Sequence, residues 1–266
     1  MIEALPRAKG DGLIHVRQKA GKSALSDLRM SGCLKVLFSR GGPRLDAILI
    51  NSAGGLTSGD RLSVEIGLED GASASVTTQA AERAYRAAYG TARVETRMAV
   101  AEGAQMLWLP QELILFDGAK LERSLHCDLA PGARALLVEP VIFGRAKMGE
   151  ALRDIRFSDR ISVDREGVPL YRDATRLAGD MEDVLAGSAI ARGAGAMVTL
   201  VYAAPDAAHH HGAIVQDLPE TAGASLLQDD LMVLRMLAAD GFVLRQSLLP
   251  VLDRLTENTL PTSWRL

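Results

Sequence analysis

The sequence is poor in the residues that mark several protein classes. Only two cysteines occur among 266 residues, too few for a disulfide-stabilised scaffold, so we expect reduced thiols and a cytoplasmic protein. The formal net charge of −3 leaves no excess of the basic residues that nucleic-acid binding usually requires. All apolar runs are shorter than the roughly 18 residues of a membrane-spanning helix. We therefore expect neither a nucleic acid nor a membrane as a partner.

The residues that are present describe a folded protein with many turns. Hydrophobic residues make up 48% of the chain and charged residues 24%, a mixture that excludes intrinsic disorder. The 25 glycines, set against only 4% aromatic residues, suit tight turns and small side chains. The sequence begins MIEALPRAKGDG, with no apolar run after its charges, so no secretory signal is expected.

Apolar and polar residues alternate with period two through much of the first 220 residues. The alternation is clearest at 61–68, 94–100 and 121–127, as expected of half-buried strands. Turn signals such as Asp70-Gly71 separate these segments. An exposed antiparallel pair with its turn at Glu166-Gly167 is predicted within 153–183. The pattern predicts a mainly β fold, with many short antiparallel and stacked strands in a β-helical or sandwich arrangement.

The period changes to that of a helix between residues 225 and 257. Two apolar stripes with helical spacing follow one another, Leu227, Leu231, Leu234 and Ala238, then Leu244, Leu248, Leu252 and Leu255. They predict a helical hairpin in which Asp240-Gly241 ends the first helix. Ser247 would cap the second helix and place Pro250 in its first turn. The preceding segment, 205–224, is predicted to be a surface loop with one short strand. No linker divides the chain, so we expect a single domain over 1–266.

Familiar enzyme motifs are absent from the sequence. The segment Ala20-Gly21-Lys22-Ser23 resembles the end of a phosphate-binding loop, but the required upstream glycine is Val16. His126 and Cys127 would point to opposite faces of a strand, so they do not form a joint site. The run His209-His210-His211 could chelate a metal loosely, although a polar loop is the favoured interpretation.

Carboxylates and glycines carry most of the remaining chemistry. Asp60 follows a glycine-rich turn, where capping backbone amides would be an ordinary structural role. Glu112 and Asp117 flank a short apolar run and could face one cleft. A β-rich hydrolase or transferase that uses these two carboxylates is therefore an alternative function.

Five blocks of the sequence, in order, resemble the urease accessory protein UreD family, called UreH in some organisms. They are residues 49–62 (LINSAGGLTSGDRL), 77–86 (TTQAAERAYR), 109–119 (LPQELILFDGA), 143–150 (FGRAKMGE) and 260–265 (LPTSWR). The resemblance extends from Leu34 to the C-terminus. Thr57-Ser58 and Thr262-Ser263 depart from the family's commoner residues.

The resemblance implies a chaperone of urease assembly and not an enzyme. Such a protein binds the urease structural subunits and, through UreF, connects to the nickel-carrying GTPase UreG. GTP then belongs to UreG, no cofactor is tightly bound, and nickel is in transit through a water-filled passage. Weak oxygen ligands in succession suit a moving dication better than a closed thiolate site. The candidate ligands in or beside the five blocks are Asp60, Glu82, Glu112, Asp117, Glu139 and Glu150.

Overall fold

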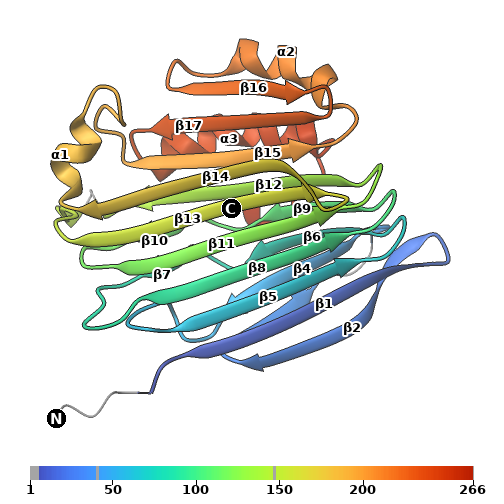
Figure 1. Cartoon of the computed structure of the whole chain (residues 1–266), viewed down its shortest axis with the longest axis horizontal. Helices are drawn as coiled ribbons and strands as arrows, with labels where there is room; N and C mark the ends of the chain where they lie inside the picture. Colours follow the sequence, from blue (N-terminus) through green and yellow to red (C-terminus); the bar gives the residue numbers. More distant parts are fainter. Residues whose placement is uncertain (1–5, 40–41, 146–147, 266) are drawn as a thin grey trace.

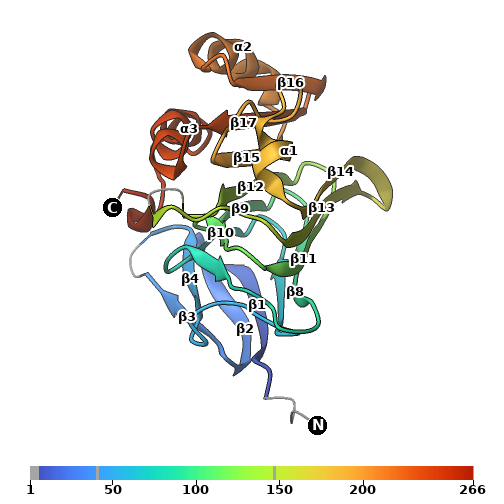
Figure 2. The same ribbon diagram turned by 90° about the vertical axis from the view of Figure 1, so that its left-hand side faces the viewer.

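A computed structural model of the chain describes residues 6–39, 42–145 and 148–265. Within these residues, two β-sheets face each other (Figures 1 and 2). The first sheet has the spatial order β14 (Val168–Gly179), β13 (Ile155–Arg165), β11 (Lys120–Leu129), β8 (Ala92–Val100), β5 (Arg61–Leu68), β1 (Lys9–Lys19) and β2 (Lys22–Gly32). The second has the order β16 (Ala222–Gln228), β17 (Leu231–Ala238), β15 (Ala196–Ala203), β12 (Arg134–Phe143), β9 (Gln105–Leu109), β6 (Ser73–Thr78), β4 (Leu45–Asn51) and β3 (Leu34–Phe38). Two short strands complete it, β10 (Leu113–Leu115) beside β12 and β7 (Glu82–Ala84) beside β10.

The central strands are stacked like the coils of a solenoid. The chain passes from β5 to β6, from β8 to β9 and from β11 to β12, changing sheet each time, and the strands of successive coils pair in parallel. Gly71, Gly103 and Gly132 turn the chain between the sheets with φ values of 66°, 63° and 68°, which a residue with a Cβ adopts only with strain. The predicted mainly β, stacked-strand architecture is confirmed.

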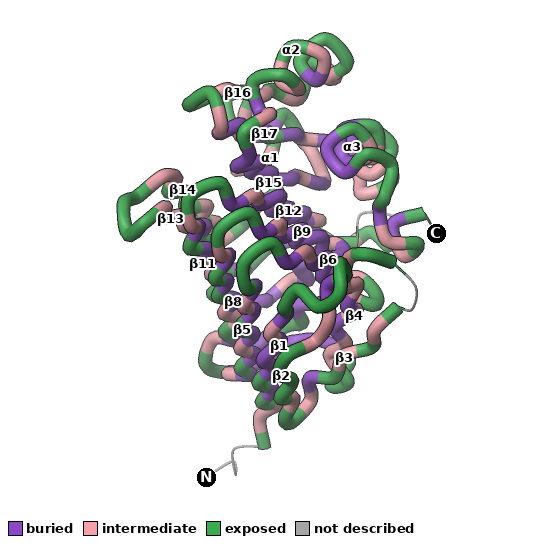
Figure 3. The backbone as a smooth tube through the Cα atoms, turned by 90° about the vertical axis from the view of Figure 1, so that its right-hand side faces the viewer, coloured by how far each residue is buried: buried purple, intermediate pink, exposed green. Residues whose placement is uncertain are grey.

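Two apolar clusters hold the layers together. One lies between the sheets and includes Leu62, Val64, Ile66 and Leu68, the alternate residues of β5. The other lies between the second sheet and the helices α2 (Ala207–Asp217) and α3 (Gly241–Leu255). Figure 3 shows the buried residues concentrated between the sheets and the exposed residues at their turns. The second sheet is therefore covered on both faces along β9, β12, β15 and β17.

The antiparallel pair predicted within 153–183 is confirmed as β13 and β14. Glu166 and Gly167 form its turn, with φ values of 51° and 75°. The pairing is irregular between Val163 and Asp164. After this pair come the short helix α1 (Met181–Ala186) and, near the C-terminus, the 3₁₀ turn η2 (Thr262–Trp264). None of the helices in the described part of the chain is long and apolar enough to cross a membrane.

The predicted helical hairpin at 225–257 is half wrong. Its first half is the hairpin formed by β16 and β17, and only α3 is helical. Strand β17 contacts the core on one face and α3 on the other. Because both faces are apolar, the alternation of a strand is lost and a helical spacing arises by coincidence.

The helix boundaries also differ from the prediction. Asp240 caps the start of α3, where its side chain accepts a hydrogen bond from the Val243 N–H at 2.9 Å, and it does not end a preceding helix. Pro250 consequently lies inside α3 instead of in a first turn capped by Ser247. The predicted loop at 205–224 is mostly the helix α2.

Candidate functional site

A cavity of about 220 Å³ lies between the two sheets. Its walls are mainly leucine and valine side chains from both sheets, and its polar residues include Asn51, Glu82, Arg123 and Glu139. At one side it is lined by the exposed residues Gln79, Ala80 and Arg83. At the other it is lined by Trp108 and Glu139, which are 6% and 4% exposed. Carboxylates are thus present both near the solvent and deep between the sheets.

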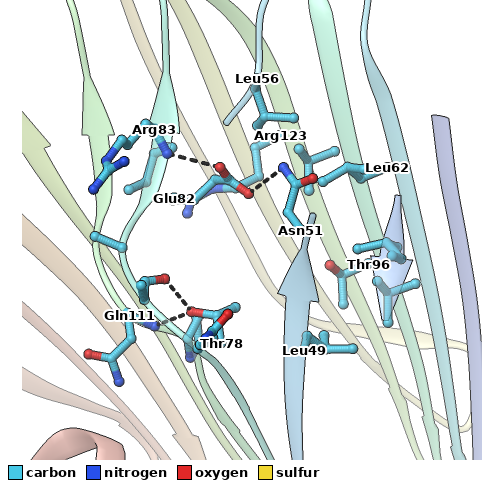
Figure 4. Close-up of a pocket in the computed structure, with 18 of the residues that line it drawn as sticks. Leu49, Asn51, Leu56, Leu62, Thr78, Glu82, Arg83, Thr96, Gln111 and Arg123 are labelled. Carbon is cyan, nitrogen blue, oxygen red and sulfur yellow. Dashed lines mark hydrogen bonds between the residues drawn. The ribbon is translucent and has the colours of Figure 1, made fainter. Parts of the chain in front are cut away.

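Glu82 is the carboxylate near the solvent. Its side chain points towards Asn51, whose Nδ2 donates a hydrogen bond to Glu82 Oε2 at 3.0 Å (Figure 4). The backbone N–H of Arg83 donates to Oε1 at 2.9 Å. Burial raises the pKa of Glu82 above its ordinary value, and these two hydrogen bonds only partly oppose that effect.

Glu139 is the deep carboxylate, and it belongs to a network that joins the sheets. Trp108 Nε1 donates to Glu139 Oε1 at 2.8 Å, and Arg123 Nη1 lies 2.5 Å from Oε2. Arg123 also forms two hydrogen bonds with Asp159, the residue paired with it on β13, at 3.0 and 2.6 Å. One guanidinium from the first sheet is therefore shared by two carboxylates, one from each sheet.

Burial raises the pKa of Glu139 to about 7, since the charged form loses hydration between the sheets. Asp159 raises the pKa further, whereas Arg123 and the indole N–H of Trp108 lower it. Burial alone would lower the pKa of Arg123, but Asp159 and Glu139 outweigh it and raise that pKa, so Arg123 stays charged. Glu139 can thus gain or lose a proton near neutral pH while its neighbour keeps a positive charge.

Two other candidates, Asp117 and Glu150, lie together in a separate hollow that Arg86 and Arg145 also line. Asp117 accepts hydrogen bonds from the backbone N–H groups of Arg153 and Asp154 at 2.7 and 3.0 Å and forms an ion pair with Arg86. Glu150 pairs with Arg145 at 3.0 Å and accepts a hydrogen bond from the Asp117 N–H at 3.3 Å. Ala146 and Lys147, in the same sequence block as Glu150, lie outside the described residues.

The remaining two candidates hold the fold together. Asp60 accepts hydrogen bonds from the backbone N–H groups of Ala8 and Thr57, both at 2.8 Å, which is the turn-capping role considered for it. Glu112 binds Arg245 of α3 through contacts of 2.9 to 3.2 Å. The structure therefore brings together neither all six candidates nor the pair Glu112 and Asp117.

Sequence reasoning overlooked Arg123 and Asn51. Arg123 shares one face of its strand with Leu121, Leu125 and Cys127, all buried. A charged residue on the apolar face of a strand was the available signal, because such a residue requires buried partners. Asn51 lies within the glycine-rich block. The sequence could not show that its side-chain amide binds Glu82, because the two residues are 31 positions apart.

The histidine run and the cysteines do not form a site with the cavity. His209, His210 and His211 follow one another on α2, where the rings of His209 and His210 pack edge to face with their centroids 5.2 Å apart. His210 lies 3.6 Å from Asp206, and His211 Nε2 is 3.2 Å from the backbone oxygen of Ala224. Cys33 and Cys127 are both free thiols, as expected.

This arrangement places carboxylate oxygens, which are ligands for small cations, at the wall of the cavity. Carboxylates with raised pKa values can release a proton when a cation arrives and regain it when the cation leaves. Asn51 and the indole N–H of Trp108 hold the two carboxylates in position.

A family model and individual relatives of this chain carry the same family name. The family model described as "UreD urease accessory protein" matches residues 8–265. A urease accessory protein UreD of Ruegeria pomeroyi is 52% identical over 246 residues, which cover 92% of this chain and 96% of that protein. A UreD of Roseobacter denitrificans is 45% identical over 262 residues, with 98% and 96% covered. A protein of Brucella melitensis named urease accessory protein UreD 1 is 40% identical over 269 residues, with 99% and 96% covered.

Proposed function

Because the chain belongs to the UreD urease accessory protein family, we propose that it assists the maturation of urease. It binds the urease structural subunits and, with UreF and the GTPase UreG, delivers nickel through the cavity between its sheets. In this proposal the chain acts in the cytoplasm without catalytic activity of its own, and nickel is its cargo.

The observation that carries the nickel proposal is Glu139, a buried carboxylate with a raised pKa at the deep side of the cavity. Glu82 supplies a second such carboxylate towards the solvent. Oxygen ligands of this kind hold a borderline dication weakly and exchange it readily. A closed thiolate site would instead retain the ion.

Arg123 gives a physical reason for the ion to move on. Its guanidinium contacts Glu139 and stays charged, so a dication bound at Glu139 is repelled by a neighbouring positive charge in a medium that screens poorly. Nickel can bind there only by displacing the proton of the neutral carboxyl or by weakening the ion pair that the charged carboxylate forms with Arg123. Glu139 therefore acts as a transient ligand, which is what a passage requires.

The alternative, a hydrolase or transferase using Glu112 and Asp117, has less support. The Glu112 carboxylate is bound by Arg245, and the Asp117 carboxylate is bound by Arg86 and two backbone amides. Catalysis needs an acid and a base that converge on one substrate atom. These two carboxylates lie in different networks.

Co-expression of the urease subunits and accessory proteins tests the proposal. We expect urease made without this chain to be present but poor in nickel and inactive. Glu82→Gln and Glu139→Gln should each reduce nickel content, while co-purification shows that the complex with the partners still forms. Glu122→Gln is the matched control, since Glu122 is a half-exposed carboxylate of β11 paired with Arg93.

Two results contradict parts of the proposal. Normal nickel loading of urease without this chain would show that the chain is not needed for maturation. Normal loading with the double Glu82→Gln/Glu139→Gln variant would show that nickel does not pass these carboxylates. The chain would then act through its interfaces alone.

A further inference from the structure

A second group of potential metal ligands lies on the outer face of the first sheet. Cys127 is buried between the sheets, so its neighbours His126 and Asp128 point outward. Asp128 is paired with Asp164 of β13 in the parallel register. In the described part of the chain, these three residues, His126, Asp128 and Asp164, form the group whose ligand atoms lie within 4.8 Å of one another.

The distances suit a single metal ion. His126 Nε2 lies 3.0 Å from Asp128 Oδ2 and 3.8 Å from Asp164 Oδ2. Ligand atoms bound to one ion at about 2.1 Å are separated by about 3 to 4 Å. The separations of the His126 nitrogen from the two carboxylate oxygens therefore match those of ligands on one ion.

Asp164 is held in place by a neighbouring residue. Arg172 pairs with Oδ1 of Asp164 and also donates hydrogen bonds of 2.9 Å to the backbone oxygens of Val163 and Tyr171. This leaves Oδ2 directed at His126, and the side chain of Asp164 is only 14% exposed. Fixed orientation of a carboxylate ligand by a second residue is typical of metal sites.

Small residues occupy the positions beside the group on the next two strands. Along the register from Asp128, the next strands carry Ala99, Gly67 and then His15. A Cβ on residue 67 would lie 2.7 Å from the His15 ring, so the glycine lets that ring lie across the sheet. These residues line an open hollow of about 860 Å³ with Asp128 at its side. Water molecules can therefore complete the coordination of an ion.

Two acidic residues paired directly across adjacent strands repel each other unless a positive charge lies between them. Arg172 supplies a positive charge to Asp164, but at Oδ1, the oxygen that faces away from His126. An ion at His126 would neutralise the near oxygens of both carboxylates. One imidazole nitrogen with two carboxylate oxygens is a donor set that suits divalent transition metals better than Mg²⁺ or Ca²⁺.

We propose that His126, Asp128 and Asp164 form a binding site for a divalent transition-metal ion of the Ni²⁺ or Zn²⁺ class on the outer face of the first sheet. The site is separate from the cavity, because its side chains project from the opposite face of the sheet. It does not depend on the proposed delivery of nickel to urease.

Chemical modification of histidines in the full-length chain tests the site. The side chains of His126 and His15 are 37% and 39% exposed, and both lie on the same outer face, so His15 is a matched internal control. Diethylpyrocarbonate modification is mapped by mass spectrometry with and without Ni²⁺. At a free Ni²⁺ concentration about ten times the Kd, we expect His126 to react about tenfold more slowly and His15 at an unchanged rate. Mg²⁺ at the same concentration should protect neither.

The variant Asp164→Asn distinguishes metal binding by His126 from simple shielding of its side chain. It should raise the Ni²⁺ concentration needed for protection of His126 by about tenfold or more, with protection measured in each protein relative to its own reaction rate without metal. Glu122→Gln, on the same strand and face, should leave protection as in the wild type. Equal protection of both histidines, no protection of His126, or full protection in Asp164→Asn would each overturn the proposal.

Discussion

Two groups of arginine and carboxylate side chains in this protein shift the pKa values of their carboxylates in opposite directions. Between the sheets, Arg123 is shared by Glu139 and Asp159. In the surface hollow, Arg86 and Arg145 pair with Asp117 and Glu150. Burial raises the pKa of Glu139 despite Arg123. In the hollow, burial also acts to raise the pKa values of Asp117 and Glu150, but hydrogen bonds outweigh it and lower both.

The difference lies in what surrounds each carboxylate. Asp117 accepts two backbone N–H hydrogen bonds that stabilise its charged form and remains near solvent. Glu139 accepts one hydrogen bond, from an indole, and shares its cation with a second carboxylate. Hydrogen bonds therefore keep the carboxylates of the surface hollow charged, whereas Glu139 in the cavity can exchange a proton despite its ion pair.

The largest expected effect comes from removing Arg123. Arg123→Met leaves the buried Glu139 and the partly buried Asp159 without their cation, which should lower the free energy of unfolding by about 3–5 kcal/mol. Arg145→Met is the control, because the Arg145 side chain is half exposed and its loss should be much less costly. Urea unfolding followed by tryptophan fluorescence measures both. Equal losses of stability would show that burial does not distinguish the two groups.

The pH dependence of stability should have opposite sign in the two groups. The folded pKa of Glu139, about 7, exceeds an unfolded value of about 4.3, so its contribution is present below that unfolded value and is lost as the pH rises through 7. Relative to Glu139→Gln, the wild type should lose about 3 kcal/mol between pH 4 and 7 by order of magnitude.

Asp117 should behave in the reverse manner. Its folded pKa is lowered, so its contribution is present above an unfolded pKa of about 3.9 and is lost as the pH falls through the folded value. Unfolding curves of wild type, Glu139→Gln and Asp117→Asn at several pH values compare the two. Parallel pH profiles for both variants would contradict the assignment.

The smallest expected effect concerns Asn51, which positions Glu82 by a hydrogen bond. Asn51→Ala should lower stability by about 1 kcal/mol and raise the pKa of Glu82 further, since a bond to its charged form is lost. Carboxyl ¹³C NMR titration of labelled glutamate measures that pKa. An unchanged or lower value would show that Asn51 does not hold the carboxylate.

Local pattern was enough for much of the fold. Alternation along β5, β8 and β11, and the Glu166-Gly167 turn, were predicted correctly because one face of each strand is apolar and the other polar. The pattern failed for β17, whose two faces are both covered, and for α2, whose alanines and histidines carry no apolar stripe.

The sequence by itself determined the mainly β class and the five blocks that resemble the family. It also gave the six candidate carboxylates, among them Glu82 and Glu139. Only the tertiary structure decided which carboxylates share the cavity, that Arg123 stands between the sheets, and that Glu112 and Asp60 serve the fold. The physical reason is that pKa values and ion pairs depend on burial and on partners distant in the chain. Asn51 and Glu82 are 31 residues apart, as are Trp108 and Glu139, and only the stacking of coils brings each pair into contact.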